Sequence, residues 1–190
     1  LVKTVTLGIV AAIGDDKHRN RYRLEHSLVR SDGLGDWGKT IEDALTGPAS
    51  QYLLTEARAE QTELTQLCRK GDWQYECVIE LKTALQDLQI EAEDVPARSD
   101  MKRWFRLFAT LRNKTRGHGA TLPAKASAAI PHLARTINLF FEKHCLFKRP
   151  WTFLYRKLSG KYRVSRITDD ATPFEFLKKS TEWTLPNGIY

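Results

Sequence analysis

Apolar residues recur every three or four positions along most of the chain, which is the period of amphipathic helices. The clearest case follows Asp72, whose carboxylate suits an N-cap. Trp73, Cys77, Leu81 and Leu85 form one apolar stripe after it. The same period predicts helices over residues 17–29, 41–45, 50–68, 73–90, 101–116 and 123–144. We therefore expect a mainly α-helical protein.

Glycine and capping residues shape the first of these helices. Residues 31–38 contain three glycines, so we expect a loop there, with Asp36 or Thr40 capping the short helix that follows. The helix over 50–68 is expected to turn apolar side chains inward, among them Leu54 and Leu67.

The last two helices carry the largest apolar side chains. Ser99 or Asp100 is expected to cap the first, and the glycines of residues 117–119 end it. Pro123 suits the first position of the second helix, whereas Pro131 removes a backbone hydrogen bond and should kink or split it. Their expected buried positions are Met101, Trp104, Phe105, Phe108, Leu111, Leu122, Ala126, Ile130, Leu133, Ile137, Phe140 and Phe141.

Near the C-terminus the hydrophobic period changes from helical to alternating. The segments TFLYRKL and KYRVSRIT, joined by Ser159-Gly160, predict an antiparallel hairpin. Either Leu154 and Val164, or Tyr162 and Ile167, then share one face.

This change of period predicts two parts. We expect residues 1–146 to form an up-and-down helical bundle, and residues 147–190 to be a β-hairpin or α+β segment that begins a truncated second domain. The chain begins at Leu1 rather than Met, so we expect it to be a fragment of a longer protein.

Charge and cysteine content narrow the classes of partner. The chain has 30 Lys and Arg against 23 Asp and Glu, a formal charge of +7, which favours an anionic partner such as nucleic acid. Its three cysteines lack the spacing of a disulfide scaffold or a zinc motif, so we expect no metal, no cofactor and a cytoplasmic location. The longest apolar stretch, residues 7–13, is too short to cross a membrane.

One stretch of the chain carries candidate chemistry. Residues 111–120 (LRNKTRGHGA) place Arg112, Asn113 and His118 within seven positions. The two glycines that flank His118 give the backbone conformational freedom there. In a continuous helix, positions six apart point about 120° away from each other. If the helix ends near Arg116, however, His118 can curl back toward Arg112, and both can approach one phosphate. Histidine moves protons near neutral pH, and arginine stabilises charge on phosphate oxygens.

The arrangement Arg112-Asn113, four residues, His118 resembles the Arg-polar-x4-His motif of the HEPN superfamily of small helical domains. The Phe-rich helix before it and the long helix after it are also similar to that family, and the resemblance covers roughly residues 17–146. It implies a bundle of four or five helices that forms a homodimer, in which two copies of Arg112 and His118 face each other in a composite, metal-independent ribonuclease site. Attack by a ribose 2′-OH would leave a 2′,3′-cyclic phosphate and a 5′-OH. Asn113 would orient the phosphate or His118.

Five basic residues near the motif are candidate RNA contacts, because cations on one helix hold a phosphate backbone. They are Lys102, Arg103, Arg106, Lys114 and Arg116. The family context implies a toxin or antiphage-defence role, with RNA as substrate and a regulatory domain or antitoxin as further partners. Family members silenced by nucleotide transfer carry a Tyr two residues after the His, where this chain has Ala120, so that form of control is not expected.

Other interpretations of the same residues stay open. The bundle is alternatively a non-catalytic dimerisation, nucleotide-sensing or RNA-sensing module of a larger regulator, or a plain nucleic-acid-binding adaptor supported by charge alone. On position alone, Arg112 also suits an ion pair with a neighbouring helix, and His118 suits an ordinary loop position.

Overall fold

The computed structural model describes residues 1–14, 17–31, 33–117, 123–149, 151–156, 162–166 and 188–189. The chain divides into two compact units, Leu1–Leu146 and Phe147–Tyr190. The predicted mainly α class is confirmed. Its α-helices (α) and 3₁₀-helices (η) are α1 (Val2–Ala11), α2 (Asn20–Val29), α3 (Leu34–Thr46), η1 (Pro48–Tyr52), η2 (Thr55–Ala57), α4 (Arg58–Thr65), α5 (Trp73–Asp87), α6 (Met101–Gly117), α7 (Pro123–Lys143) and η3 (Cys145–Lys148).

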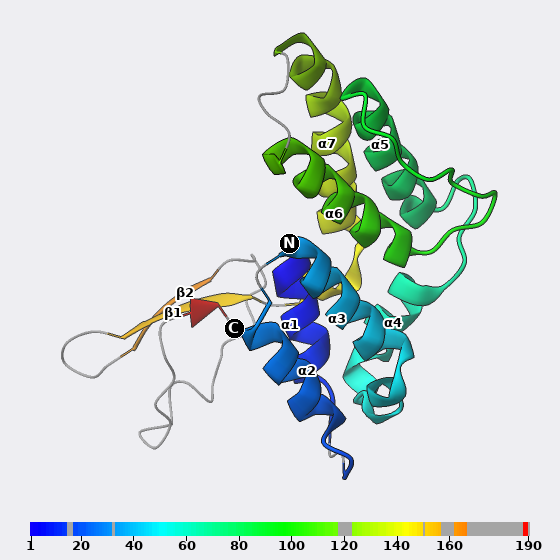
Figure 1. The fold of residues 1–190 in the computed structure, drawn as a ribbon. Coiled ribbons are helices and arrows are strands. Elements are labelled where there is room, and N and C mark those ends of the chain that lie inside the picture. Colours follow the sequence, from blue (N-terminus) through cyan, green and yellow to red (C-terminus); the bar gives the residue numbers. More distant parts are fainter. Residues whose placement is uncertain are drawn as a thin grey trace. The chain divides into compact units, whose positions relative to one another are not determined.

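The α-helices of the first unit lie in two groups. Helices α5, α6 and α7 lie together in one group, and α1 to α4 form the other (Figure 1). Helix α3 packs against both α1 and α6, so it joins the two groups. The described part of this unit therefore holds more helices than the four or five of the expected bundle.

A buried polar network ties α5, α6 and α7 together. The Trp104 ring stacks on Phe140, with ring centroids 4.7 Å apart. Its indole N–H donates to the Thr136 hydroxyl (2.8 Å), which in turn donates to the carbonyl oxygen of Cys77 (2.7 Å). Because Trp104, Thr136 and Phe140 are all 0% exposed, these contacts fix how α6 is rotated against its neighbours.

The capping predictions for α5 and α6 have different outcomes. Asp100 Oδ1 accepts the backbone N–H of Lys102 (3.1 Å), so Asp100 caps α6 as expected. Asp72 occupies the N-cap position of α5, but its carboxylate accepts the N–H of Arg69 (2.9 Å) in the preceding turn. The carboxylate therefore fixes the turn between α4 and α5 instead of capping the first turn of α5.

The predicted loop over residues 31–38 is wrong, because α3 begins at Leu34. Asp36 does not precede the helix but lies within its first turn, where its carboxylate accepts the Gly33 N–H (3.0 Å). Buried Trp37 and Ile41 lie on the helix's inner face. The apolar stripe thus starts earlier than the glycines suggested.

The predicted continuous helix over residues 50–68 is also wrong. The segment instead forms η1, η2 and α4, separated at Leu53 and Leu54. There the Leu54 N–H donates to the carbonyl of Ala12 (2.9 Å), so the backbone pairs with the end of α1 instead of with itself. Leu54 and Leu67 are 49% and 66% exposed, not inward-facing.

Helix α7 runs through Pro131 without being split. Pro131 and Ser127, four residues earlier, are both exposed, so the carbonyl that loses its partner lies on the solvent side of the helix. The inward face is centred on Ala129, Thr136 and Phe140. Two positions expected to be buried are instead exposed: Ile130 by 60% and Phe141 by 44%.

Among its described residues, the second unit has three strands: β1 (Thr152–Arg156), β2 (Tyr162–Arg166) and β3 (Gly188–Ile189). They pair antiparallel in the order β2-β1-β3. Leu154 lies opposite Val164 across β1 and β2. The expected turn at Ser159-Gly160 lies outside the described residues, as does Ile167.

Candidate functional site

The C-terminal half of α6 presents the Arg112 motif. One Arg112 guanidinium nitrogen, Nη1, donates to Asn113 Oδ1 (3.4 Å), so two of the three motif side chains are neighbours. Arg112 is half-buried, and Asn113 is exposed. His118 lies outside the described residues, and α6 ends at Gly117, one residue before it. The position of His118 relative to Arg112 therefore stays a prediction.

Arg112 also lies against the N-terminus of α3. A methyl group built on Gly33 would be 3.2 Å from Arg112 Nη1 and 3.4 Å from Asp36 Oδ2. Glycine at this position therefore leaves space for the guanidinium beside the first turn of α3. The Asp36 carboxylate, which accepts the N–H of the same glycine, places a negative charge on that side of Arg112.

Three other cations of α6 have carboxylate partners. Each forms an ion pair: Lys102 with Asp100 (3.5 Å), Arg103 with Glu93 (3.0 Å) and Arg106 with Glu42 (2.6 Å). Lys114 is exposed, and the side chain of Arg116 lies outside the described part of the chain. Of the five candidate RNA contacts, three thus already have an anionic partner.

An acidic linker before α6, residues 91–98, takes part in this charge pairing. Glu93 and the carbonyl of Asp94 both contact Arg103, while the Asp94 carboxylate accepts a hydrogen bond from Lys82 (2.6 Å). That hydrogen bond lowers the pKa of Asp94. The linker therefore occupies one basic side chain of α5, Lys82, and one of α6, Arg103, which leaves both less available to an anionic partner.

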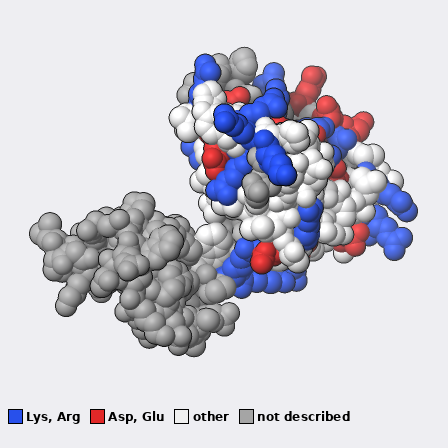
Figure 2. All heavy atoms as spheres, turned by 90° about the horizontal axis from the view of Figure 1, so that it is seen from below, with Lys and Arg blue, Asp and Glu red and all other residues white. Residues whose placement is uncertain are grey.

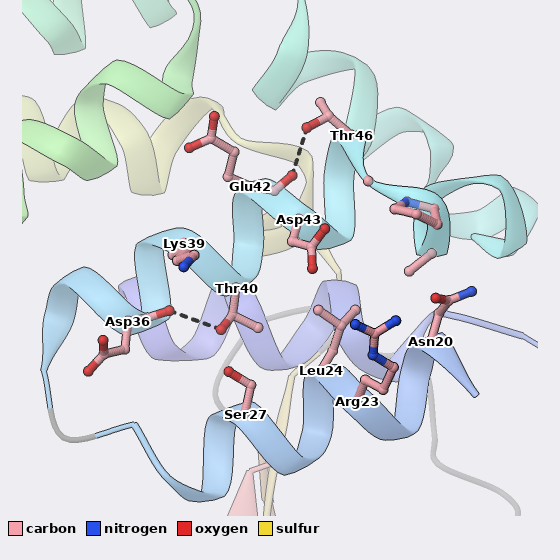
Figure 3. Close-up of a pocket in the computed structure, with 13 residues that line it drawn as sticks. Asn20, Arg23, Leu24, Ser27, Asp36, Lys39, Thr40, Glu42, Asp43 and Thr46 are labelled. Atoms are coloured by element: carbon pink, nitrogen blue, oxygen red, sulfur yellow. Dashed lines mark hydrogen bonds between the residues drawn. The ribbon is translucent and has the colours of Figure 1, made fainter. Parts of the chain in front are cut away.

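A polar groove of about 780 Å³ opens between α2 and α3. Arg23 and Ser27 line it from α2, and Asp36, Lys39 and Asp43 line it from α3 (Figure 3). This groove was not predicted from the sequence. A signal was present, since the polar residues 36, 39, 43 and 46 recur with helical period beside the apolar stripe of α3.

Two histidines without metal-type spacing in the sequence are held by glutamates. His132 Nδ1 lies 2.6 Å from Glu80, whose other oxygen binds Arg135 Nε (2.9 Å). His144 Nδ1 lies 2.6 Å from Glu63 Oε2, and Cys145 follows directly in the chain. These contacts join residues more than 50 positions apart, so local spacing gave no sign of them.

Figure 2 shows basic side chains spread over the face in view, with acidic side chains among them. On that face the positive excess is not gathered into one continuous patch. On this face, the charge distribution alone therefore does not select a binding surface.

In the described part of the chain, no helix combines the length and apolar character needed to cross a membrane. A comparison with models of protein families, with curated proteins and with solved structures gives no match.

Proposed function

We propose that this chain is a metal-independent endoribonuclease of the HEPN type, with Arg112 and His118 as catalytic residues and Asn113 in support. One observation carries the proposal: among the described cations of α6 up to Lys114, Lys102, Arg103 and Arg106 have carboxylate partners, whereas Arg112 has only the Asn113 amide as hydrogen-bond partner. A guanidinium held by an amide keeps donors for a phosphate. The motif resemblance and the helical bundle support the same conclusion.

The proposed reaction needs only groups from the motif and from RNA. One His118 accepts the proton of a ribose 2′-OH as the 2′-oxygen attacks the adjacent phosphorus. The bond from phosphorus to the 5′-oxygen breaks, and the second His118 of a homodimer gives that oxygen a proton. Arg112 stabilises the negative charge that develops on the phosphate oxygens. The products are a 2′,3′-cyclic phosphate and a 5′-OH.

The proposed RNA path follows the end of α6. Lys114 and Arg116 supply phosphate contacts beside the motif, and Lys102, Arg103 and Arg106 contribute only by exchanging carboxylate partners for phosphates. Because each such exchange breaks an ion pair, these three add less affinity than free cations would. We place the enzyme in the cytoplasm, in a toxin or antiphage-defence system, restrained by a regulatory domain or an antitoxin.

The test is cleavage of single-stranded RNA by the full chain in the presence of a chelator. Arg112→Ala and His118→Ala should each lower the cleavage rate by at least about 100-fold, since general acid–base and electrostatic contributions are of that size. Lys70→Ala, which removes an exposed cation from the turn before α5, is the matched control and should cut normally. Equal rates in all four proteins would refute the site assignment.

The groove between α2 and α3 favours a second candidate, a non-catalytic module that senses a nucleotide. Its volume lies within the range of small-molecule sites, and Arg23 and Lys39 offer cations for phosphates beside the carboxylates of Asp36 and Asp43. This alternative predicts that ATP or GTP binds without any RNA cleavage. Arg23→Ala combined with Lys39→Ala should then weaken binding at least tenfold, whereas Arg112→Ala should not.

A further inference from the structure

Three metal-ligating side chains from distant parts of the chain meet where α4 approaches the end of α7. They are Glu63 of α4, His144 directly after α7, and Cys145 at the start of η3. A carboxylate oxygen, a ring nitrogen and the thiol sulfur of these residues all lie within 4.8 Å of one another. Glu63 is separated from the other two by about 80 residues, so the fold, not local sequence, assembles the set.

Hydrogen bonds orient the donors before any ion arrives. Glu63 Oε2 lies 2.6 Å from His144 Nδ1 and accepts the backbone N–H of Cys145 (2.9 Å). The carboxylate is thereby fixed over the point where the chain leaves α7. A site whose ligands are already oriented loses little side-chain entropy on binding.

The surroundings are dry on one side and open on the other. His144 is 0% exposed and lies against the Phe140 and Trp73 rings, with centroids 4.9 and 6.2 Å away. The Glu63 side chain is 25% exposed, and Cys145 is also partly exposed. Aromatic walls strengthen the attraction between ion and ligands, while the exposed side leaves a route for an ion to enter.

We propose that Glu63, His144 and Cys145 bind a divalent ion of the zinc class. Thiolate and imidazole select such an ion over Mg²⁺ or Ca²⁺, which take oxygen ligands. With zinc–ligand distances of about 2.0–2.3 Å, tetrahedral ligand atoms lie about 3.3–3.6 Å apart. Binding therefore shortens the longest donor–donor separations by up to about 1.5 Å, and it lengthens the 2.6 Å contact between Glu63 Oε2 and His144 Nδ1.

Three protein donors leave the fourth tetrahedral position to water or another ligand. The Cys145 thiol releases its proton, because the thiolate is the ligand, and His144 binds as the neutral imidazole. The ion then ties α4 to the end of α7, so it should stabilise the helical unit, and more so the tighter it binds. This role is independent of the proposed ribonuclease site on α6.

The test uses the full chain with Co²⁺ and Zn²⁺ as probes. Co²⁺ should give a near-ultraviolet thiolate-to-cobalt charge-transfer band that Zn²⁺ abolishes by competition. Cys145→Ser should remove the band, and Glu63→Gln should weaken Co²⁺ binding at least about tenfold. Cys68→Ser is the matched control, because Cys68 lies outside the cluster, and it should keep the band.

The same experiment can overturn the proposal. Absence of the band in the folded wild-type chain would do so, as would a band that survives in Cys145→Ser or disappears in Cys68→Ser. If Glu63→Gln fails to fold, far-ultraviolet circular dichroism reveals it, and Cys145→Ser decides the question. Zn²⁺ should also raise the melting temperature of wild type but not of Cys145→Ser; an equal rise in both would contradict the assignment.

Discussion

Removing the hydroxyl of Thr136 is the most stringent test of how α5, α6 and α7 are held together. It accepts the Trp104 indole N–H and donates to the Cys77 carbonyl, with all three residues 0% exposed. Thr136→Val keeps the shape and removes both hydrogen bonds. The stranded indole donor costs about 1–3 kcal/mol, and the second bond adds about 1 kcal/mol. We therefore expect a loss of about 2–4 kcal/mol, a large share of the roughly 5–15 kcal/mol that stabilises a typical domain.

Thr136→Ser is the matched control, because it keeps the hydroxyl and loses one methyl group. Its cost should be about 1 kcal/mol. Urea unfolding of the full chain, followed by tryptophan fluorescence and circular dichroism, should show a lower midpoint for Thr136→Val by about 1 M or more, with an unchanged slope. If Thr136→Val proves as stable as Thr136→Ser, hydrogen bonding is not what fixes α6 here.

Three further predictions concern single positions. Glu80→Gln removes the charge that pairs with Arg135 and weakens the short contact with His132 Nδ1, and it should lower the unfolding free energy by about 1–2 kcal/mol in thermal melts. An unchanged melting temperature would show that the charge of Glu80 does not stabilise the fold. Burial raises the pKa of the Cys77 thiol to about 12, so this thiol should resist alkylation at pH 8. Its contribution to stability should be lost as pH rises from about 9 to 12. Rapid alkylation of all three cysteines in the native chain would be inconsistent with this. Gly47→Ala places a methyl group 2.6 Å from the Asp43 carbonyl oxygen and should cost about 1–3 kcal/mol in urea unfolding, whereas a neutral result would mean that the turn after α3 can relax.

Hydrophobic period predicted the helices whose buried stripes are long and regular. Helix α5 and helix α6 begin and end close to the expected residues, and Trp104 and Phe105 are buried as the spacing required. The hydrophobic period gave wrong predictions where the backbone forms hydrogen bonds with residues far away in the sequence. Leu54, for example, donates its N–H to Ala12, which stops the helix that its own neighbourhood favours.

Glycine and proline signals had mixed outcomes: α6 ends at Gly117 and α7 begins at Pro123 as expected, but other positions differ. The glycines of residues 33–38 suggested a loop, yet Asp36 holds the Gly33 N–H and starts α3 there. Pro131 suggested a break, yet its exposed position lets α7 continue. Helix α1 was not anticipated, because residues 2–11 offer few polar positions to mark a second face.

The candidate sites differ in how much of each could be predicted from the sequence. Arg112 and Asn113 are adjacent in the chain, so local spacing was enough to bring them together. The meeting of Glu63 with His144 depends on how α4 packs near the end of α7, and nothing within one helix encodes it. The ion pairs of Arg103 with Glu93 and of Arg106 with Glu42 could likewise not be predicted, because they depend on the tertiary fold.

The most direct test of the central claim compares two oligonucleotides in the presence of a chelator: a single-stranded RNA, and the same RNA with deoxyribose at the cut position. The proposed mechanism predicts that the wild-type chain cuts the RNA to a 2′,3′-cyclic phosphate and a 5′-OH, leaves the deoxyribose position intact, and loses cleavage in Arg112→Ala. Cleavage of both oligonucleotides at the same position, or of neither, would contradict it.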